Sequence, residues 1–414
     1  MDRRLFNTYA SAWVSPRVLD AGYAYNPAQP LGRVPGDFRY SVPDAPDVDG
    51  YRRFIEGMPE VDTPEMFGLH PNADLTFRVK EASAFLTTMS DMRPSEGGGG
   101  GAAPAPSAAA QDAALEAPSA APKTQDEIVS EKAAEFLSRM PEDYTEDDVR
   151  VRIRKLGGMA EPLNIFLYQE VQRLQAVILR VRAQLQQMQQ ALRGEVVMTS
   201  ELLTAMGDMH NARVPRGWLY TPGGDEFSWL TPTLGAWYAS LLERDTQLRG
   251  WLMNGRPACF WMTGFANPQG FLTAMKQEVT RLHRGQAWAL DDVVYHSEVT
   301  EWERPEQVRA APKEGVYVYG LFVEGARWDR AQGSLAESEP KRLFAPLPVL
   351  HITTLSKALS DEKRKAAGVA LYDMPVYRYA ARTGRYFVFN ASLPAKNNPP
   401  EHWTLRGAAV LCQT

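Results

Sequence analysis

The chain has 414 residues, which exceeds the usual size of one compact core, so we expect two or three domains. Hydrophobic residues make up 44% of it and its formal net charge is -5, a balance typical of a folded protein without the basic stripe that binds nucleic acid. No window approaches the roughly 20 apolar residues of a membrane-spanning helix, and the N-terminus lacks the apolar core of a signal peptide. We therefore expect an intracellular protein, with neither nucleic acid nor a membrane as partner.

The segment before Arg93 alternates short helical stretches with proline turns. It predicts a helix that ends at Pro59, a compact turn around 64–72 and a second helix. The following stretch, Ser95–Pro122, consists almost wholly of Gly, Ala, Pro and Ser, which is typical of a flexible linker or surface insertion. Its glycine run is not followed by Gly-Lys-Ser/Thr, so we do not expect a phosphate-binding loop there.

Helices are predicted to dominate from Thr124 to about residue 285. A capping box at Thr124–Glu127 begins one helix, which stops before Pro141. A longer helix is expected from Pro162 to Gly194, because proline suits the first helical position and glycine the end. A coiled-coil dimer is the alternative for this helix. Its apolar residues recur every three or four positions and form one stripe: Leu163, Leu167, Val171, Leu174, Ile178, Val181, Leu185, Met188 and Leu192.

Three further helices are expected before residue 285. The first is capped by Ser200, and the other two lie within Ser228–Gly255 and Cys259–His283. Large aromatic residues usually anchor a core, so we predict that the tryptophans near the helix ends are buried. Stacking of sugars on exposed tryptophans is the alternative. The tryptophans in question are Trp229, Trp237, Trp251 and Trp261.

From about residue 290 the hydrophobic period changes to two. Together with the helices, this predicts an α+β fold: a helical layer with one long helix, followed by a small antiparallel six-stranded β-barrel. Thr383 and Gly384 are expected to form a tight hairpin turn. The six predicted strands are Asp292–Val299, Val316–Val323, Phe344–Ile352, Met374–Ala381, Arg385–Ser392 and Arg406–Cys412.

The stretch Glu314–Asp329 is apolar or aromatic at nearly every position before it reaches a glycine. As one continuous strand it would place Val316, Val318, Gly320 and Phe322 on one face, and Tyr317, Tyr319, Leu321 and Val323 on the other. After a turn at Glu324 and Gly325, we expect Trp328 to be buried as a cap on the barrel. Arg327 and Asp329 would then share a face of the returning strand.

Motifs for common catalytic and metal sites are missing from the sequence. There is no His-Glu-x-x-His, Cys-x-x-Cys or Gly-x-Ser-x-Gly, so neither zinc nor a nucleophilic serine is expected. Cys259 and Cys412 are predicted to be buried free thiols. Glu324 and Asp329 would serve in glycoside hydrolysis only if they faced one cleft, and solvated turn residues are the simpler interpretation.

Several longer strings carry more specific information than the composition. In chain order they are PEMFGLHPNADLTF, PTLGAWYASLLERDTQLRGWL, FWMTGFANPQGFLTAMKQ, GVYVYGLFVEGARWD, MPVYRY and HWTLRGAAVLC. Together they resemble the C-terminal region of a dynein heavy chain, over nearly the whole chain apart from the Gly/Ala/Pro-rich insertion. The long insertion and the short hairpin at Thr383 resemble an axonemal heavy chain, with the outer arm as the candidate subtype, more than the cytoplasmic form.

The resemblance implies a division of the chain into four parts. These are the end of the sixth AAA+ module with a connecting segment (1–94), a disordered insertion (95–123), the helical part of the dynein C-terminal domain (124–289) and the terminal β-barrel (290–414). In that family the C-terminal domain lies across the AAA+ ring and modulates motor output. The resemblance therefore implies a non-catalytic structural and regulatory region of a microtubule-based, ATP-driven motor of the cilium and flagellum. Its location would be the cytoplasm and cytoskeleton, in the axoneme.

The resemblance also implies which groups the protein binds. No cofactor is expected here, because ATP and Mg would bind the upstream AAA+ modules of the parent protein. The partner would be the ring of the same heavy chain, with microtubules and other subunits reached only through the parent. The alternative is a free-standing aromatic-rich module that binds a ligand or protein. The residues expected to support the structure or face the ring are Tyr317, Tyr319, Arg327, Trp328, Asp329, Trp237, Trp261 and Phe265.

Overall fold

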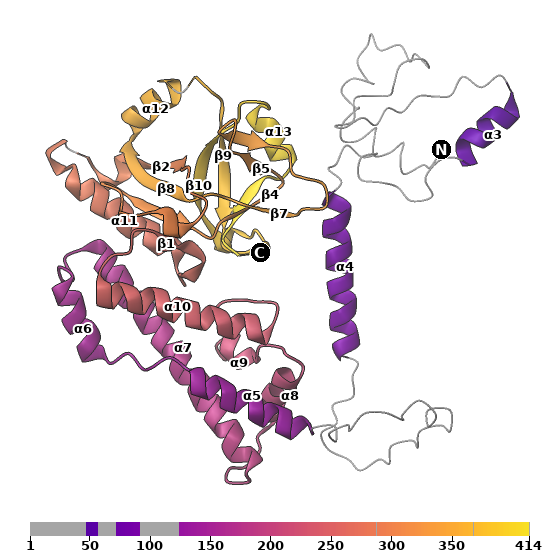
Figure 1. Ribbon diagram of the computed structural model, residues 1–414, viewed down its shortest axis with the longest axis vertical. Helices are drawn as coiled ribbons and strands as arrows, with labels where there is room; N and C mark the ends of the chain where they lie inside the picture. The colour runs from indigo at the N-terminus through magenta and orange to yellow at the C-terminus, as the bar shows by residue number, and fades with distance from the viewer. Residues whose placement is uncertain (1–46, 57–71, 92–123, 287, 367, 414) are drawn as a thin grey trace.

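The computed structural model describes residues 47–56, 72–91, 124–286, 288–366 and 368–413. Most of the predicted turn at 64–72 and all of the Gly/Ala/Pro-rich stretch lie outside these residues. Figure 1 shows a layer of helices below a group of strands, with one helix, α4, standing beside both. The fold class is α+β, as predicted.

The helices begin and end close to where the sequence places them. The capping box is confirmed: the Glu127 amide donates to Thr124 Oγ1 (3.3 Å), and the Thr124 amide donates to Glu127 Oε2 (2.9 Å). Thr199, not Ser200, caps α8, because its side chain accepts from the Leu202 amide. The helices are α3 (Val48–Glu56), α4 (Asn72–Asp91), α5 (Gln125–Arg139), α6 (Glu146–Lys155), α7 (Pro162–Leu192), α8 (Ser200–His210), α9 (Arg216–Leu219), α10 (Leu234–Asn254), α11 (Pro268–Leu282), α12 (Lys357–Ala366) and α13 (Pro400–Leu405).

The long helix α7 is the central element of the helical layer. It has 31 residues, and its predicted apolar stripe is buried from Leu163 to Met188. Helices α5, α10 and α11 pack against it within the same chain. The stripe is therefore filled by the protein's own helices, and the alternative of a coiled-coil dimer loses its basis.

The strands form two open sheets and a hairpin, so the closed antiparallel six-stranded barrel is wrong. One sheet has the order β1-β3-β8-β2, the other β10-β9-β11-β4-β7, and β5 pairs with β6. Two pairs, β1 with β3 and β11 with β9, are parallel. The strands are β1 (Phe260–Trp261), β2 (Val293–Val299), β3 (Val316–Tyr319), β4 (Phe322–Glu324), β5 (Arg327–Asp329), β6 (Ser334–Ala336), β7 (Phe344–Pro346), β8 (Leu350–Ser356), β9 (Leu371–Tyr377), β10 (Phe387–Pro394) and β11 (Ala409–Leu411).

The predicted strand Val316–Val323 is divided at Gly320, which corrects its expected alternation. Gly320 has φ +79°, and a Cβ there would lie 2.6 Å from Trp261 Cδ1. The backbone turns at this point from β3 in the four-stranded sheet to β4 in the five-stranded sheet. Val316 and Val318 are buried before the glycine, and Leu321 and Val323 are buried after it. The buried positions therefore change from even-numbered to odd-numbered residues at Gly320.

The hairpin after β4 contains the predicted Arg327 and Asp329 pair. Their side chains lie on one face and approach to 3.9 Å. Trp328 packs against the edge of the core, as predicted, but it is only partly buried.

The connection between β9 and β10 is longer than the predicted two-residue turn at Thr383. It includes a 3₁₀ turn, Gly384–Tyr386. Arg382 is tied to other parts of the fold, because it donates to the Gly407 carbonyl (2.6 Å) and to Glu324 Oε2 (2.5 Å). These contacts tie the loop to β4 and to the residues just before β11.

Helix α4 is fastened to the β part at its first residue. The side-chain Nδ2 of Asn72 donates to the backbone carbonyls of Glu339 (3.1 Å) and Arg342 (2.8 Å). Its Oδ1 accepts from the Lys341 amide (2.7 Å). Asn72 therefore joins α4 to the loop between β6 and β7, although most of α4 stands apart from the sheets in Figure 1.

Candidate functional site

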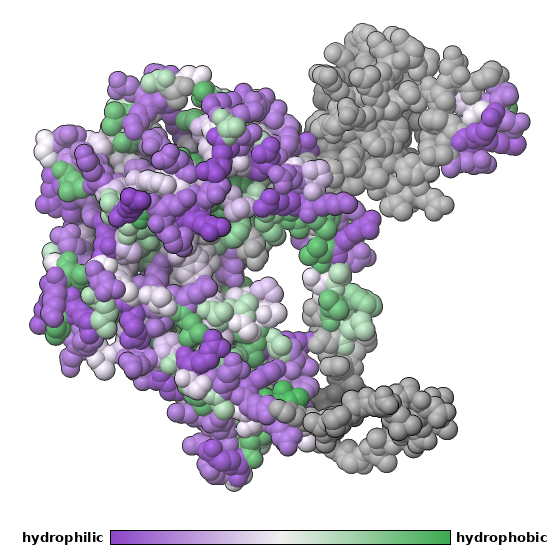
Figure 2. Space-filling view, viewed as in Figure 1, coloured by the Kyte–Doolittle hydropathy of each residue, from purple (hydrophilic) through white to green (hydrophobic). Residues whose placement is uncertain are grey.

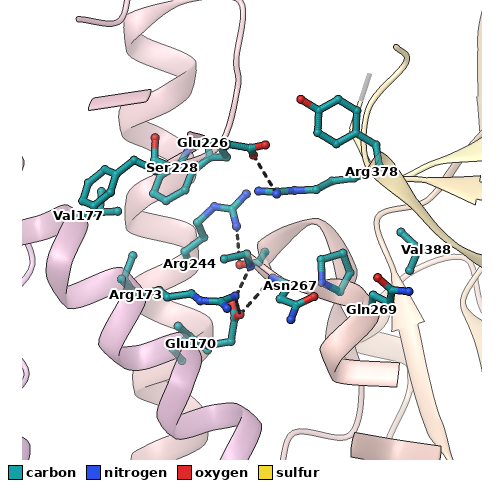
Figure 3. A pocket seen from close by; sticks show the side chains of 18 of the residues that line it. Glu170, Arg173, Val177, Glu226, Ser228, Arg244, Asn267, Gln269, Arg378 and Val388 are labelled. Carbon is teal, nitrogen blue, oxygen red and sulfur yellow. Dashed lines mark hydrogen bonds and ion pairs between the residues drawn. The ribbon is translucent and has the colours of Figure 1, made fainter. Parts of the chain in front are cut away.

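A hollow lined by ionisable groups lies where the helical layer meets the connection between β9 and β10. Its volume is about 470 Å³. Figure 3 shows charged side chains from α7, α10 and the β part converging on it. We call it the junction cavity. Its charged lining residues are Glu170, Arg173, Glu226, Arg244, Arg378 and Arg385.

Arg244 of α10 is the most buried cation of the junction cavity, with 2% of its surface exposed. Its Nη1 donates to the Gly264 carbonyl (2.6 Å) and its Nε to Ser240 Oγ (3.2 Å). The guanidinium also lies over the ring of Trp229, 4.2 Å from the centroid. Burial, with a smaller effect from the nearby Arg378 charge, lowers the pKa of Arg244 to about 9. At neutral pH it therefore remains a buried cation.

Glu170 places a carboxylate on the buried side of α7. It accepts from the amides of Ala266 (2.6 Å) and Asn267 (3.1 Å), just before α11, and pairs with Arg173 at 3.3 Å. Burial raises the pKa of Glu170, and the two amide donors and the arginines oppose that shift. The carboxylate thus fixes the loop before α11 to the long helix.

Glu226 and Arg378 form the link between the helical layer and β9. They pair at 2.9 Å, and the Tyr379 hydroxyl donates to Glu226 Oε1 at 2.9 Å. The same hydroxyl accepts from the Leu230 amide (3.2 Å). Burial raises the pKa of Tyr379 well above its usual range, so the phenol stays protonated. Hydrogen bonds and an ion pair therefore connect the side chains on this side of the junction cavity.

The two cysteines and the carboxylate pair singled out in the sequence have defined states in the structure. Burial raises the pKa of Cys259 and of Cys412 to about 12, so both are thiols at neutral pH. Both cysteines are free; Cys412 is buried as predicted, whereas Cys259 is only half-buried. Glu324 pairs with Arg382, while Asp329 accepts from the Ala331 amide (2.9 Å), so these carboxylates serve separate structural contacts.

Two further site classes have no counterpart in the described part of the chain. Over these residues there is no group of three or more His, Cys, Asp or Glu side chains that could hold a metal ion. None of the helices described is long and apolar enough to cross a bilayer.

Three of the sequence-predicted residues lie around the junction cavity. Trp237 stacks on Trp229 with ring centroids 5.0 Å apart, and Trp261 lies 5.6 Å from the Arg244 guanidinium. Phe265 is fully buried between the lining residues Gly264 and Ala266. The structure does not bring the other five to this place: Tyr317, Tyr319, Arg327, Trp328 and Asp329 belong to β3 and β5. Their contacts with a ring stay a prediction.

The buried tryptophans weaken the sugar-binding alternative. Trp229, Trp237 and Trp251 are 3%, 0% and 2% exposed. Trp218 joins the same group at 5.0 Å from Trp237. These tryptophans are core anchors of the helical layer, as predicted, and offer no open stacking surface. Trp261 was predicted to be buried with them but is only partly buried.

The charged residues of the junction cavity were not selected from the sequence, although two of them interrupt apolar stripes. Glu170 follows Leu167 by three positions on the buried face of α7. Arg244 stands between Leu241 and Leu248, at helical spacing. A charge inside an apolar stripe indicates a buried polar contact and could have marked both residues. Nothing local to the sequence indicates that Glu226 meets Arg378.

Fold and cavity together define a two-part α+β region whose parts are joined by an aromatic core and a charged network. Comparison with known proteins places this region. The family model for the C-terminal domain of the dynein heavy chain matches residues 79–412, and that for the AAA lid domain of the dynein heavy chain matches residues 1–73. The protein belongs to the dynein heavy chain family.

Individual relatives agree with this assignment. The sequence is 39% identical over 411 residues to dynein axonemal heavy chain 8 of Homo sapiens and to dynein axonemal heavy chain 5 of Mus musculus. It is 36% identical over 414 residues to the dynein gamma chain, flagellar outer arm, of Chlamydomonas reinhardtii. Each match covers 99% of this chain but 8% of the relative. The axonemal and flagellar relatives confirm the expected axonemal type and its location in the axonemal cytoskeleton.

Proposed function

We propose that this protein is a non-catalytic structural and regulatory region at the C-terminal end of an axonemal dynein heavy chain. It packs on the AAA+ ring of that heavy chain and modulates motor output. The order of the two matched models supports this placement, because an AAA lid domain precedes the C-terminal domain. The parent would be an ATP-driven, microtubule-based motor whose upstream AAA+ modules bind ATP and Mg.

The observation that carries the proposed packing is the surface of α4. Phe85 and Leu86 are 64% and 65% exposed, and Phe77 and Met89 are also exposed. Figure 2 shows apolar surface along this helix where it stands clear of the sheets. Exposed apolar residues on a helix adjoining a lid domain favour cover by a neighbouring module. We assign that cover to the AAA+ ring of the same heavy chain.

The state of the ionisable groups supports a structural role. In the junction cavity the carboxylates of Glu170 and Glu226 accept hydrogen bonds and pair with arginines. A general base needs a carboxylate that is free to reach a substrate proton. The free-standing ligand-binding module remains the second candidate, and its tryptophan surface has lost support through burial.

A comparison of two motor domains tests the regulatory role. One ends with this 414-residue region and the other is truncated before residue 124, and both are assayed for ATP hydrolysis and for the speed of microtubule gliding. We expect both to hydrolyse ATP and the truncated motor to glide at a changed speed.

A third motor domain with Phe85→Ser and Leu86→Ser tests the packing. We expect it to resemble the truncated motor, because polar side chains weaken an apolar contact. Ser83→Ala, on the same helix, is a mild control. Identical gliding by the complete and truncated motors would contradict the regulatory role, and unchanged gliding by the double variant would contradict the assigned contact.

A further inference from the structure

We propose that the junction cavity binds a phosphate-type oxyanion, either inorganic phosphate or the phosphate group of a nucleotide. This inference goes beyond the proposed function, because it adds a ligand site to a region proposed to be structural.

The charged lining residues do not balance. Four arginines face two glutamates. Glu170 pairs with Arg173 and Glu226 with Arg378, so both carboxylates are used. Within the described ranges, Arg244 and Arg385 have no carboxylate at ion-pair distance, so the lining carries two more positive than negative charges.

The burial of Arg244 makes this charge imbalance unfavourable. A buried cation loses its hydration, and neutral acceptors offset only part of that cost. Arg244 has two such acceptors, the Gly264 carbonyl and the Ser240 hydroxyl. An anion in the cavity would supply the missing opposite charge.

The side chain of Trp229, which lines the same cavity, carries a second buried donor. Trp229 is almost fully buried, and its Nε1–H finds no acceptor among the residues that the structure describes. Unsatisfied buried donors are rare in folded proteins, and each calls for a partner. An indole N–H donates only, so the partner that it would take is an acceptor such as an oxyanion oxygen.

The type and placement of the donors favour phosphate. Guanidinium groups donate two parallel hydrogen bonds to phosphate oxygens, and phosphate carries enough charge to balance two arginines. A volume of about 470 Å³ accommodates a small ligand together with water. Arg244 belongs to α10, whereas Arg385 belongs to the connection before β10. A bound anion would therefore bridge the helical layer and the β part.

Calorimetric titration of the 414-residue protein with inorganic phosphate at low ionic strength tests the site. We expect saturable binding to one site that weakens as salt is added. Arg385→Gln should weaken the binding about three- to tenfold, because it removes one exposed charge from the rim. Arg309→Gln, an exposed arginine outside the cavity, is the matched control and should leave the affinity unchanged.

A second variant addresses the buried donor. Arg244→Lys keeps the charge but loses the two-pronged donor geometry, so we expect at least about tenfold weaker phosphate binding. Near-UV circular dichroism shows whether this variant is folded, and Arg385→Gln keeps the test valid if it is not. Absence of saturable phosphate binding, or equal effects of Arg385→Gln and Arg309→Gln, would overturn the proposal.

Titration with AMP in parallel distinguishes the two sources. Tighter binding of AMP than of phosphate would assign the site to a nucleotide, and equal or weaker binding would assign it to inorganic phosphate. Either result supports an oxyanion site. Absence of phosphate binding would not change the expected result of the gliding comparison, so the two proposals are tested independently.

Discussion

The helical layer and the β part meet through two contrasting halves of one junction. In the apolar half, a cluster is formed by Phe166 of α7, Phe260 of β1, Phe271 of α11 and Phe265 in the loop before α11. The ring centroids of Phe265 and Phe271 lie 4.6 Å apart. The charged half is the junction cavity. Apolar burial there is non-directional and close-packed, whereas the charged half depends on individual hydrogen bonds and leaves open space. The first half sets the stability of the junction, and the second leaves room for a ligand.

The largest effect is expected from breaking the apolar half. Phe271→Ala removes a fully buried ring that contacts Phe166, Phe260 and Phe265. Such a cavity lowers the free energy of unfolding by about 3–5 kcal/mol. Urea unfolding followed by tryptophan fluorescence measures it, and Phe271→Leu is the milder control. A loss below about 1 kcal/mol would show that this cluster does not hold the two parts together.

A smaller effect is expected where the backbone passes between the two sheets. Gly320→Ala combines a left-handed backbone with a methyl group 2.6 Å from Trp261 Cδ1, so we expect a loss of about 2 kcal/mol or more. Gly333→Ala is the matched control, since Gly333 also has a positive φ but nothing within 4 Å of its Cβ position. Equal losses in the two variants, measured by thermal unfolding, would contradict the close approach of Trp261.

Trp328 lies between the two extremes, because it is only partly buried at the edge of the core. We expect Trp328→Ala to lower the free energy of unfolding by about 1–2 kcal/mol, less than a fully buried aromatic residue would lose. Trp328→Phe should recover most of this loss. A loss as large as that of Phe271→Ala would show that the indole is covered in solution.

The charged half of the junction should make the free energy of unfolding depend on pH. Burial raises the pKa of Glu170 in the folded state, so the folded protein binds more protons than the unfolded protein between the two pKa values. Within that window the Glu170 contribution to stability falls as pH rises. The Glu170→Gln variant has no titrating group at this position, although Arg173 and Arg244 remain near it. Denaturant titrations from pH 4 to 7 should therefore show a wild-type decline that the variant lacks, and parallel curves would contradict the burial of the charge.

The helical half could be predicted because its information is local. The period of three and four residues identifies α7 and its buried side directly, and the side chains of Thr124 and Glu127 fix the start of α5. The aromatic core followed from the size of Trp229 and Trp237.

The sheets could not be predicted in the same way, because strand pairing joins distant segments. Phe260 pairs with Val318 and Val410 with Val376, and no local pattern indicates either parallel pair. The break at Gly320 was readable in principle, since glycine within a strand often marks a bend. The junction cavity combines both cases: Glu170 and Arg244 interrupt apolar stripes, but their meeting with the β9–β10 connection depends on the whole fold.

The central claim, a non-catalytic region of a motor, is tested most directly by ATP turnover. Phosphate release is measured from Mg-ATP with the isolated 414-residue protein over a series of protein concentrations. A motor domain that ends with this region serves as the positive control. We predict that the isolated protein gives no release above the protein-free background, even if it binds phosphate. Turnover that rises in proportion to the concentration of the isolated protein, and that survives further purification, would contradict the account.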